Sequence, residues 1–300
     1  MQPRRSTAAL IAALLAMLTL AACGTDDTGD RGTATRTSPN ADPPSRIVSL
    51  SATATEMLFA IGAGKQVIAV DDQSNYPPEA PMTSLSSYKP NVEAIASYEP
   101  DLVVISDGTG ELAASLEQLN LQVLSAPPAR KIEDAYRQLE ELGEATGREE
   151  EAAEVVAATK KRLGEIAGSL PTGVSGATYY HELDPTYFTA TSKTFVGEVY
   201  SLLGLRNIAD PADLDASGFP QLSAEFIFKA DPDLIFLADV KCCEQSPETV
   251  KARDGWSQLR AVRRGQVVAL DDDIASRWGP RIVEFAEVVA ESLRNVEQGA

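Results

Sequence analysis

The chain has 300 residues, enough for two lobes that each bury a hydrophobic core of their own. Its formal net charge is −18, which argues against a nucleic-acid-binding protein because neutralising phosphates requires a basic surface. The same charge disfavours broad attraction to anionic lipid and favours solubility outside the cell.

Residues 1–23 have the pattern of a bacterial export signal. Arg4 and Arg5 form a charged beginning, and residues 8–20 are apolar but too short for a comfortable membrane span. Residues 20–23, with the letters LAAC, match a lipobox, in which the Cys is lipidated and becomes the new N-terminus. An ordinary cleaved signal peptide containing a Cys is the alternative. We expect an exported protein held on the extracytoplasmic face of the membrane by a lipid on Cys23.

Residues 24–45 are rich in Thr, Asp, Gly and Pro and lack apolar periodicity, which predicts a disordered tether. From residue 46 to 147, near-continuous apolar strands alternate with helical segments, a pattern typical of a parallel sheet covered on both faces. The expected strands are 47–50, 67–70, 102–106 and 123–125, and the expected helices are 53–61 and 111–119.

Residues 130–170 carry no strand signal and are rich in Glu, Ala, Lys, Arg and Leu. Gly143 and Gly147 divide them into two predicted helices. The second, within 148–168, would be roughly 28 Å long and could join two lobes. A helical joint is stiff, so we expect cleft closure to be small.

The segment 169–300 repeats the strand and helix rhythm of the first lobe. Strands are expected at 177–181, 234–237 and 267–270, and helices at 195–203 and 281–293. The predicted fold class is therefore α/β, with two Rossmann-like lobes joined by a single long helix and a ligand cleft between them.

Residues 91–105 and 223–237 share one pattern, a short helix, a turn and a buried strand. In both, a Glu stands seven residues before Pro-Asp-Leu: Glu93 in the first and Glu225 in the second. The two copies are too far apart for a solenoid unit, so they indicate two similar lobes.

Few residues suit metal or redox chemistry. Cys242 and Cys243 are adjacent, so they form either a strained vicinal disulfide or two thiols, and their neighbours make no recognisable metal site. A structural role is expected, with a redox or metal role as the alternative. His181 is the only histidine; it could face the cleft as an axial metal ligand, although a lone His is more often structural.

Enzyme classes find little support. Residues 107–113 superficially fit a dinucleotide-binding glycine pattern, but the acidic residue expected after the next strand is missing. The G-x-S-x-G motif of serine hydrolases is absent from the sequence. A hydrolytic zinc site is also poorly supported, because the sequence has one His. Residues 271–273 are three Asp that could bind a cation, although an exposed acidic turn is the plainer interpretation. We expect no enzyme activity and no resident cofactor.

Five motifs, in this order and spacing, resemble the periplasmic substrate-binding proteins of ABC importers for cobalamin, haem and ferric siderophores, most closely the cobalamin-binding members. The resemblance covers about residues 46–293 and implies two lobes linked by one helix. The motifs are 46–56 (RIVSLSATATE), 76–78 (YPP), 92–95 with 100–103 (VEAI, PDLV), 219–225 (FPQLSAE) and 276–282 (SRWGPRI).

In that family one Glu on each lobe docks the membrane permease through Arg residues, and the resemblance gives these roles to Glu93 and Glu225. Paired carboxylates could align the protein on a two-fold permease by charge-assisted hydrogen bonds. The alternative is that each is an ordinary Glu favoured by the dipole at a helix beginning.

The resemblance also implies an aromatic pocket between the lobes, because flat rings suit a corrin, a haem or an aromatic siderophore. Tyr88 and Phe219 stand where the cobalamin-binding pattern has Trp, so the pocket could take a different chelate. Packing of each ring against the core is the alternative. The implied pocket residues are Tyr76, Tyr88, Tyr187, Phe188, Phe219, Arg277 and Trp278.

The function implied is capture of a metal chelate, with cobalamin or another corrinoid favoured, and its delivery to the permease dimer of an ABC importer. A ferric siderophore or haem is the alternative. The acidic chain disfavours highly anionic iron chelates, although Arg277 and Arg281 could neutralise one locally. A zinc- or manganese-binding lipoprotein is more distant, because such sites use several His. We expect a monomer.

Overall fold

The computed structural model describes residues 42–106 and 110–298. Residues 37–300 form one compact unit. The predicted signal peptide, Cys23 and most of the predicted tether lie outside the described residues. Within the described ranges, none of the helices has the length and apolar character needed to cross a bilayer.

The first lobe is built on a parallel sheet with strand order β3-β2-β1-β4-β5. β1 and β4 lie in the middle and are buried along their whole length, which explains their unbroken apolar sequence. The strands are β1 (Ile47–Leu50), β2 (Val67–Asp71), β3 (Met82–Leu85), β4 (Leu102–Ile105) and β5 (Gln122–Ser125), and the helices are α1 (Ala52–Ala60), α2 (Val92–Ala96), α3 (Glu111–Glu117) and α4 (Ile132–Thr146).

α5 (Glu149–Gly168) joins the lobes, as predicted for a single long helix. α4 ends at Thr146, and Gly147 follows it with a φ of +68°, which suits a residue without a side chain. Gly143 does not break the helix as the sequence suggested. It lies inside α4, where the two helices approach so closely that only a glycine fits. A Cβ added at this position would come within 2.6 Å of the Cβ of Ala152 on α5.

The second lobe has a parallel sheet with strand order β7-β6-β8-β9. The strands are β6 (Thr178–Glu182), β7 (Arg206–Asn207), β8 (Leu234–Leu237) and β9 (Val267–Ala269). Its helices are α6 (Phe195–Leu202), α7 (Ala224–Ala230), α8 (Val240–Cys243), α9 (Pro247–Ala252), α10 (Arg260–Arg263), α11 (Asp272–Ser276) and α12 (Ile282–Gln298). The predicted fold class, two α/β lobes with parallel sheets, is confirmed.

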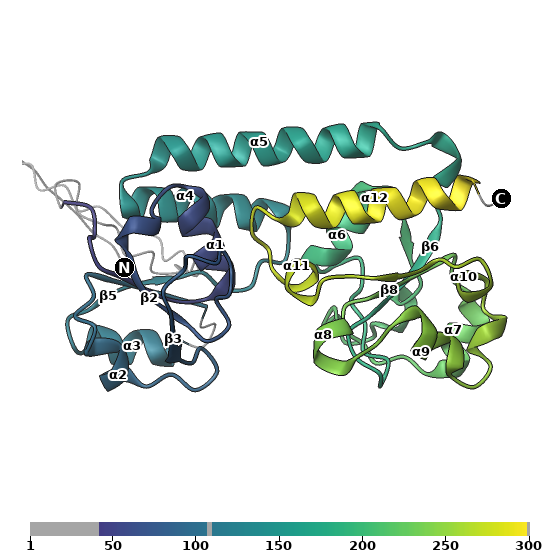
Figure 1. Cartoon of the computed structure of the whole chain (residues 1–300), viewed down its shortest axis with the longest axis horizontal. Helices are drawn as coiled ribbons and strands as arrows, with labels where there is room; N and C mark the ends of the chain where they lie inside the picture. Colours follow the sequence, from purple (N-terminus) through teal and green to yellow (C-terminus); the bar gives the residue numbers. More distant parts are fainter. Residues whose placement is uncertain (1–41, 107–109, 299–300) are drawn as a thin grey trace, which may run out of the picture. The chain divides into compact units, whose positions relative to one another are not determined.

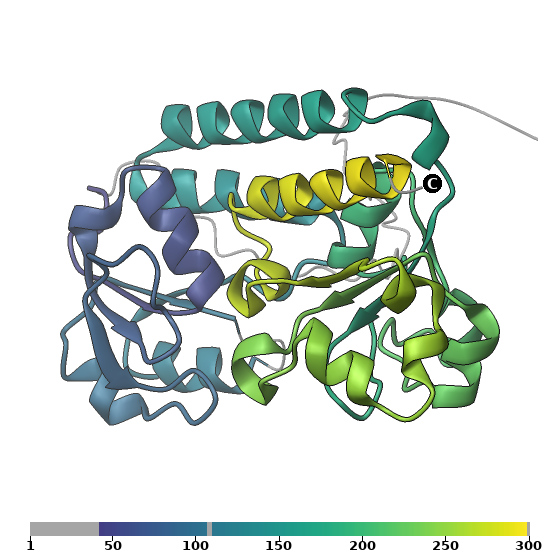
Figure 2. The same cartoon turned by 45° about the vertical axis from the view of Figure 1, so that its right-hand side comes forward.

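Hydrophobic packing ties the lobes together on one side of the sheets. α5 packs against α4 and also against α12, as Figures 1 and 2 show. A single buried cluster runs beneath these helices and takes strand residues from both sheets, including Ile47 and Tyr179. The next residues along the strands, Val48 and Tyr180, point to separate clusters on the opposite faces. The alternation shows helices covering both faces of each sheet.

Candidate functional site

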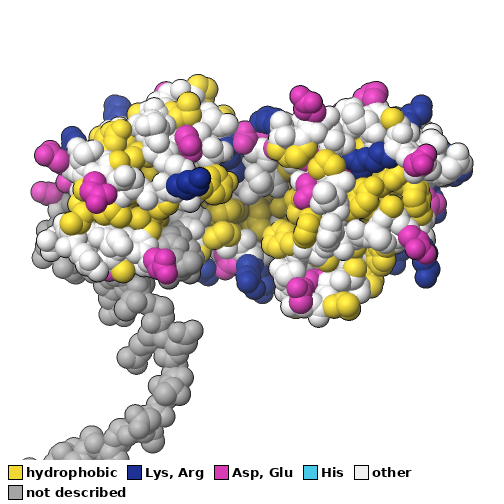
Figure 3. Space-filling view, turned by 90° about the horizontal axis from the view of Figure 1, so that it is seen from below, with side chains coloured by type: hydrophobic (Ala, Val, Ile, Leu, Met, Phe, Trp, Pro, Cys, Tyr) yellow, Lys and Arg dark blue, Asp and Glu magenta, His cyan; other side chains and the backbone are white. Residues whose placement is uncertain are grey.

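The predicted pocket residues all lie on loops near the carboxyl ends of the strands. Tyr76 follows β2, Tyr88 follows β3, Phe188 follows β6 and Trp278 follows β9. In open parallel sheets, ligands bind beside these ends. Figure 3 shows a hollow near the middle of one face, with hydrophobic side chains around it.

Four of these aromatic side chains are exposed. The exposed fractions are 81% for Tyr88, 52% for Phe219 and 40% for both Tyr76 and Phe188. Large exposed apolar groups gathered on functional loops mark interaction sites. These rings are therefore available to a ligand, which the alternative of packing into the core would not allow.

The loops carrying Phe188 and Phe219 are paired with each other. The N–H of Thr189 donates to the carbonyl of Pro220 at 3.1 Å, and the N–H of Leu222 donates to the carbonyl of Tyr187 at 3.0 Å. A short antiparallel bridge also joins Phe188 and Gln221. Backbone pairing therefore holds the two phenyl-bearing loops in a fixed relation.

Tyr187 has a different environment from its neighbour Phe188. Its ring stacks on Trp256 with centroids 5.6 Å apart, and Trp256 is buried in the second-lobe core. The guanidinium of Arg253 lies 4.6 Å from the Trp256 ring and also binds Glu182. The structure thus places Tyr187 beneath the loop surface rather than among the exposed rings.

Arg277 is buried and fully engaged within the protein. Its guanidinium donates to Glu56 at 2.8 Å, to Asp273 at 2.8 Å and to the carbonyl of Gln73 at 2.9 Å. The indole N–H of Trp278 donates to Gln138 at 2.8 Å, and its ring packs against the shared core. Sequence reasoning missed Glu56, although a single Glu within an apolar helix signals a buried partner.

Arg281 binds the same carboxylate and contacts one of the exposed rings, that of Tyr76. Its Nε donates to Glu56 at 2.9 Å, and its guanidinium lies 4.1 Å from the ring centroid of Tyr76. Hydrogen bonding to Glu56 raises the pKa of Arg281 above its ordinary value. The two arginines considered for neutralising an anionic chelate are therefore already paired.

The three aspartates at 271–273 are also paired. Lys241 Nζ lies 2.9 Å from Asp271 and 2.8 Å from Asp273. Burial opposes ionisation of Asp273, but hydrogen bonds from Lys241 and Asn75 hold its pKa below the ordinary value. Asp272 accepts hydrogen bonds from the backbone N–H groups of Val240, Lys241 and Cys242, which begin α8. Internal pairing accounts for this acidic turn.

His181 and the two cysteines differ in their exposure to solvent. His181 is fully buried, its Nδ1 lies 2.9 Å from the hydroxyl of Tyr200, and burial lowers its pKa to about 4. Cys242 is exposed, Cys243 is half-buried, and both are free thiols. Across residues 42–106 and 110–298, no three His, Cys, Asp or Glu side chains are grouped to hold a metal ion.

Glu93 and Glu225 occupy matching positions. Each is the second residue of a short helix, α2 or α7, whose preceding residue caps it by accepting a backbone N–H: Asn91 from Ala94 and Ser223 from Phe226. Both carboxylates are exposed, and neither has an ion pair within the described part of the chain. They are free to meet cations from outside.

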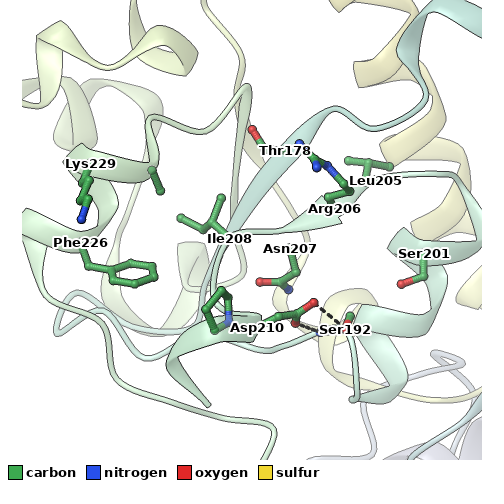
Figure 4. A pocket seen from close by; sticks show the side chains of 12 residues that line it. Thr178, Ser192, Ser201, Leu205, Arg206, Asn207, Ile208, Asp210, Phe226 and Lys229 are labelled. Atoms are coloured by element: carbon green, nitrogen blue, oxygen red, sulfur yellow. Dashed lines mark hydrogen bonds between the residues drawn. The ribbon is translucent and has the colours of Figure 1, made fainter. Parts of the chain in front are cut away.

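A separate cavity of about 660 Å³ lies beside β7 in the second lobe (Figure 4). Leu205, Ile208 and Phe226 line it, with Arg206 and Lys229 also contributing. It is distinct from the loops that carry the exposed aromatic residues.

Residues 47–274 match the model of a family described as periplasmic binding protein. The chain belongs to this family. A protein of Bacillus subtilis (strain 168), described as the uncharacterized ABC transporter substrate-binding lipoprotein YvrC, is 32% identical over 260 residues, covering 83% of this chain and 80% of that protein. The vitamin B12-binding protein of Pectobacterium carotovorum subsp. carotovorum (strain PC1) is 27% identical over 264 residues, covering 86% of this chain and 91% of that protein.

The same likeness holds among solved structures. A protein of Staphylococcus epidermidis ATCC 12228, described as a possible iron-binding (periplasmic solute-binding) protein, superposes with a TM-score of 0.72. It is 26% identical, and the match covers 84% of this chain and 99% of that chain. This periplasmic binding protein thus shares its two-lobe fold with a solved structure over nearly the whole of that structure.

Proposed function

We propose that this periplasmic binding protein is the extracytoplasmic, lipid-anchored receptor of an ABC importer and captures a corrinoid such as cobalamin. The main support for this proposal is the set of exposed rings that both lobes contribute. Tyr76 and Tyr88 come from the first lobe, and Phe188 and Phe219 come from the second. A large flat chelate offers the apolar faces that such rings bind. The chelate is cargo and not a resident cofactor.

The pairing of Arg277 and Arg281 favours a corrinoid over an anionic iron chelate. Both guanidinium groups are committed to Glu56, and Arg277 also to Asp273. Binding an anionic ligand through them would break buried ion pairs, which costs free energy. A ferric chelate or haem is the second candidate, supported by the description of the similar Staphylococcus epidermidis protein as a possible iron-binding protein.

Delivery rests on Glu93 and Glu225. Their exposed, unpaired carboxylates at equivalent helix beginnings suit two equivalent basic sites on a permease dimer. The likeness to the Bacillus subtilis substrate-binding lipoprotein supports both the transport role and the anchor at Cys23.

The test is a titration of the soluble form, residues 24–300, which keeps the compact unit 37–300 whole. Tryptophan fluorescence, corrected for ligand absorbance, and calorimetry would follow cyanocobalamin, haem and a panel of ferric siderophores. Saturable submicromolar binding of cyanocobalamin alone is expected. Saturation by an iron chelate instead would replace the ligand, and no saturation by any of them would refute the proposal.

Matched variants locate the site. We expect Tyr88→Ala and Phe219→Ala each to weaken binding at least tenfold, because each removes an exposed ring. Leu119→Ala is the control, since Leu119 is 49% exposed but follows α3 at the amino end of β5. Equal losses of affinity in all three variants would show that the aromatic loops are not part of the binding site.

A further inference from the structure

Glu56 joins the two lobes through a buried carboxylate. It lies on α1 of the first lobe and is 3% exposed. Its partners, Arg277 and Arg281, belong to the segment of the second lobe that leads into α12. A carboxylate this buried needs such partners, because an unpaired charge is costly away from water.

Further hydrogen bonds cross between the lobes beside this carboxylate. Arg277 donates to the carbonyl of Gln73 at 2.9 Å, and the amide of Asn75 donates to Asp273 at 3.1 Å. Asp273 is in turn held by Arg277 and Lys241. We call Glu56, Asn75, Asp273, Arg277 and Arg281 the junction network.

The backbone of the second-lobe segment approaches Glu56 closely. A Cβ built on Gly279 would lie 3.3 Å from Oε2 of Glu56 and 3.7 Å from its Cβ. Residues 277–281 therefore fold over the carboxylate, with one arginine at each end and a residue without a side chain between them. A side chain at position 279 would therefore press against Glu56.

The junction network also contacts the aromatic loops. Arg281 lies between Glu56 and the ring of Tyr76, which it contacts through a cation–π interaction. Trp278 lies between the two arginines and is held from the first lobe by Gln138. Two rings of the predicted pocket thus depend on groups that Glu56 holds.

We propose that Glu56 is a positioning residue that fixes segment 277–281 on α1 and thereby sets both the relation of the two lobes and the placement of Tyr76 and Trp278. It acts through Arg277 and Arg281 and does not itself touch the ligand. The effect on affinity rests on the proposed function, whereas the effect on the lobes does not.

The test compares Glu56→Gln with Glu182→Gln. Glu182 is also fully buried and binds one arginine, Arg253, but that pair lies within the second lobe. Distances between probes at positions 117 and 248, one on each lobe, would be measured by pulsed spin-label spectroscopy with Cys242 and Cys243 replaced by Ser. Both positions are exposed.

We expect Glu56→Gln to broaden the distance distribution between the lobes and to weaken cyanocobalamin binding at least tenfold. Glu182→Gln should lower thermal stability and leave the distance distribution as in the parent protein. If Glu56→Gln lowers stability while distances and affinity stay unchanged, the carboxylate only stabilises the fold and the proposal is overturned.

Two further measurements keep the outcomes separate. Arg281→Lys retains the charge but loses the forked contact with Glu56. It therefore tests the proposal if Glu56→Gln does not fold. An unchanged distance distribution in Arg281→Lys would also overturn the proposal. If the parent protein binds none of the ligands, the proposed function fails. The distance measurement needs no ligand and still decides the role of Glu56.

Discussion

Asp101 and Asp233 make matching hydrogen bonds in the two lobes. Asp101 Oδ2 accepts from the backbone N–H and the hydroxyl of Ser45, both at 2.9 Å, and Asp233 Oδ2 accepts from the same groups of Thr178, also at 2.9 Å. Asp101 precedes β4 and binds the chain just before β1, and Asp233 precedes β8 and binds the first residue of β6.

The strand register agrees with this correspondence to within one residue, because Ser45 lies 56 residues before Asp101 and Thr178 lies 55 residues before Asp233. Ile47 of β1 pairs with Leu102 of β4, and Tyr179 of β6 pairs with Leu234 of β8, with the same separation along the chain. Glu93 and Glu225 lie at equivalent distances before these strands. The proposed docking pair is therefore a structural consequence of the internal repeat, since one position recurs in both lobes.

Replacing both repeated carboxylates tests docking. We expect Glu93→Ala with Glu225→Ala to abolish uptake in cells while ligand affinity stays within tenfold, about 1.4 kcal/mol, because both side chains are exposed and unpaired within the described chain. Uptake of labelled ligand and calorimetry are the two measurements.

The control for docking is Glu117→Ala with Glu248→Ala. It removes the same charge from exposed helical positions, and Glu248 is also the second residue of its helix. Uptake should persist in this variant. A larger loss of affinity in the Glu93 and Glu225 variant would move these residues from docking to the pocket.

The sequence predicted the parts of this fold that depend on local pattern. The apolar runs at 47–50 and 102–105 are central strands, and the strand-free segment gives α4 and α5. β7 was missed because it has two residues and no apolar run. Gly143 was wrongly predicted to break the helix. A glycine is needed there because α4 lies close to Ala152 on the next helix, a contact that the sequence pattern does not reveal.

The loop positions of the candidate residues were predictable from the sequence, whereas the pairing of their side chains was not. Tyr88 and Phe219 are exposed on loops, as expected of ring contributors. Arg277 was assigned to the pocket by its motif, yet it bonds Glu56 more than two hundred residues earlier in the chain. Long-range ion pairs of this kind have no periodic signal, so only the folded structure identifies them.

Trp278→Ala should weaken ligand binding at least tenfold and lower the free energy of unfolding by about 2 kcal/mol, because the ring is partly buried against the shared core. Trp278→Phe keeps a ring but loses the hydrogen bond to Gln138, so it should cost about 1 kcal/mol. Ligand titration and urea denaturation separate the two effects. Unchanged affinity in Trp278→Ala would place this side chain outside the pocket.

The repeated aspartates should differ in their contribution to stability. Asp233 also accepts from Arg260 at 2.6 Å, and its pKa is lowered because hydrogen bonds from Thr178 and Arg260 outweigh burial. We expect Asp233→Asn to lower the free energy of unfolding by about 2 kcal/mol and Asp101→Asn by about 1 kcal/mol. Urea denaturation at neutral pH measures both, and a greater loss in Asp101→Asn would contradict the assignment.

Two buried groups make opposite contributions to the pH dependence of stability. Burial lowers the pKa of His181 to about 4 from the ordinary 6.5, so the unfolded state binds more protons between these values and stability rises with pH. Burial, aided by the charge of Glu182, raises the pKa of Asp239 to about 7 from 3.8. Here the folded state binds more protons, so stability falls as pH rises toward 7.

Each group contributes a slope of up to about 1.4 kcal/mol per pH unit, and the two slopes largely cancel between about pH 4 and 6.5. We expect Asp239→Asn to expose a rise of stability with pH and His181→Gln to expose a fall over the same range. The double variant should be nearly as flat as the parent protein. Urea denaturation at four pH values from 4.5 to 7.5 measures this, and a parental slope in Asp239→Asn would show that Asp239 is ionised throughout.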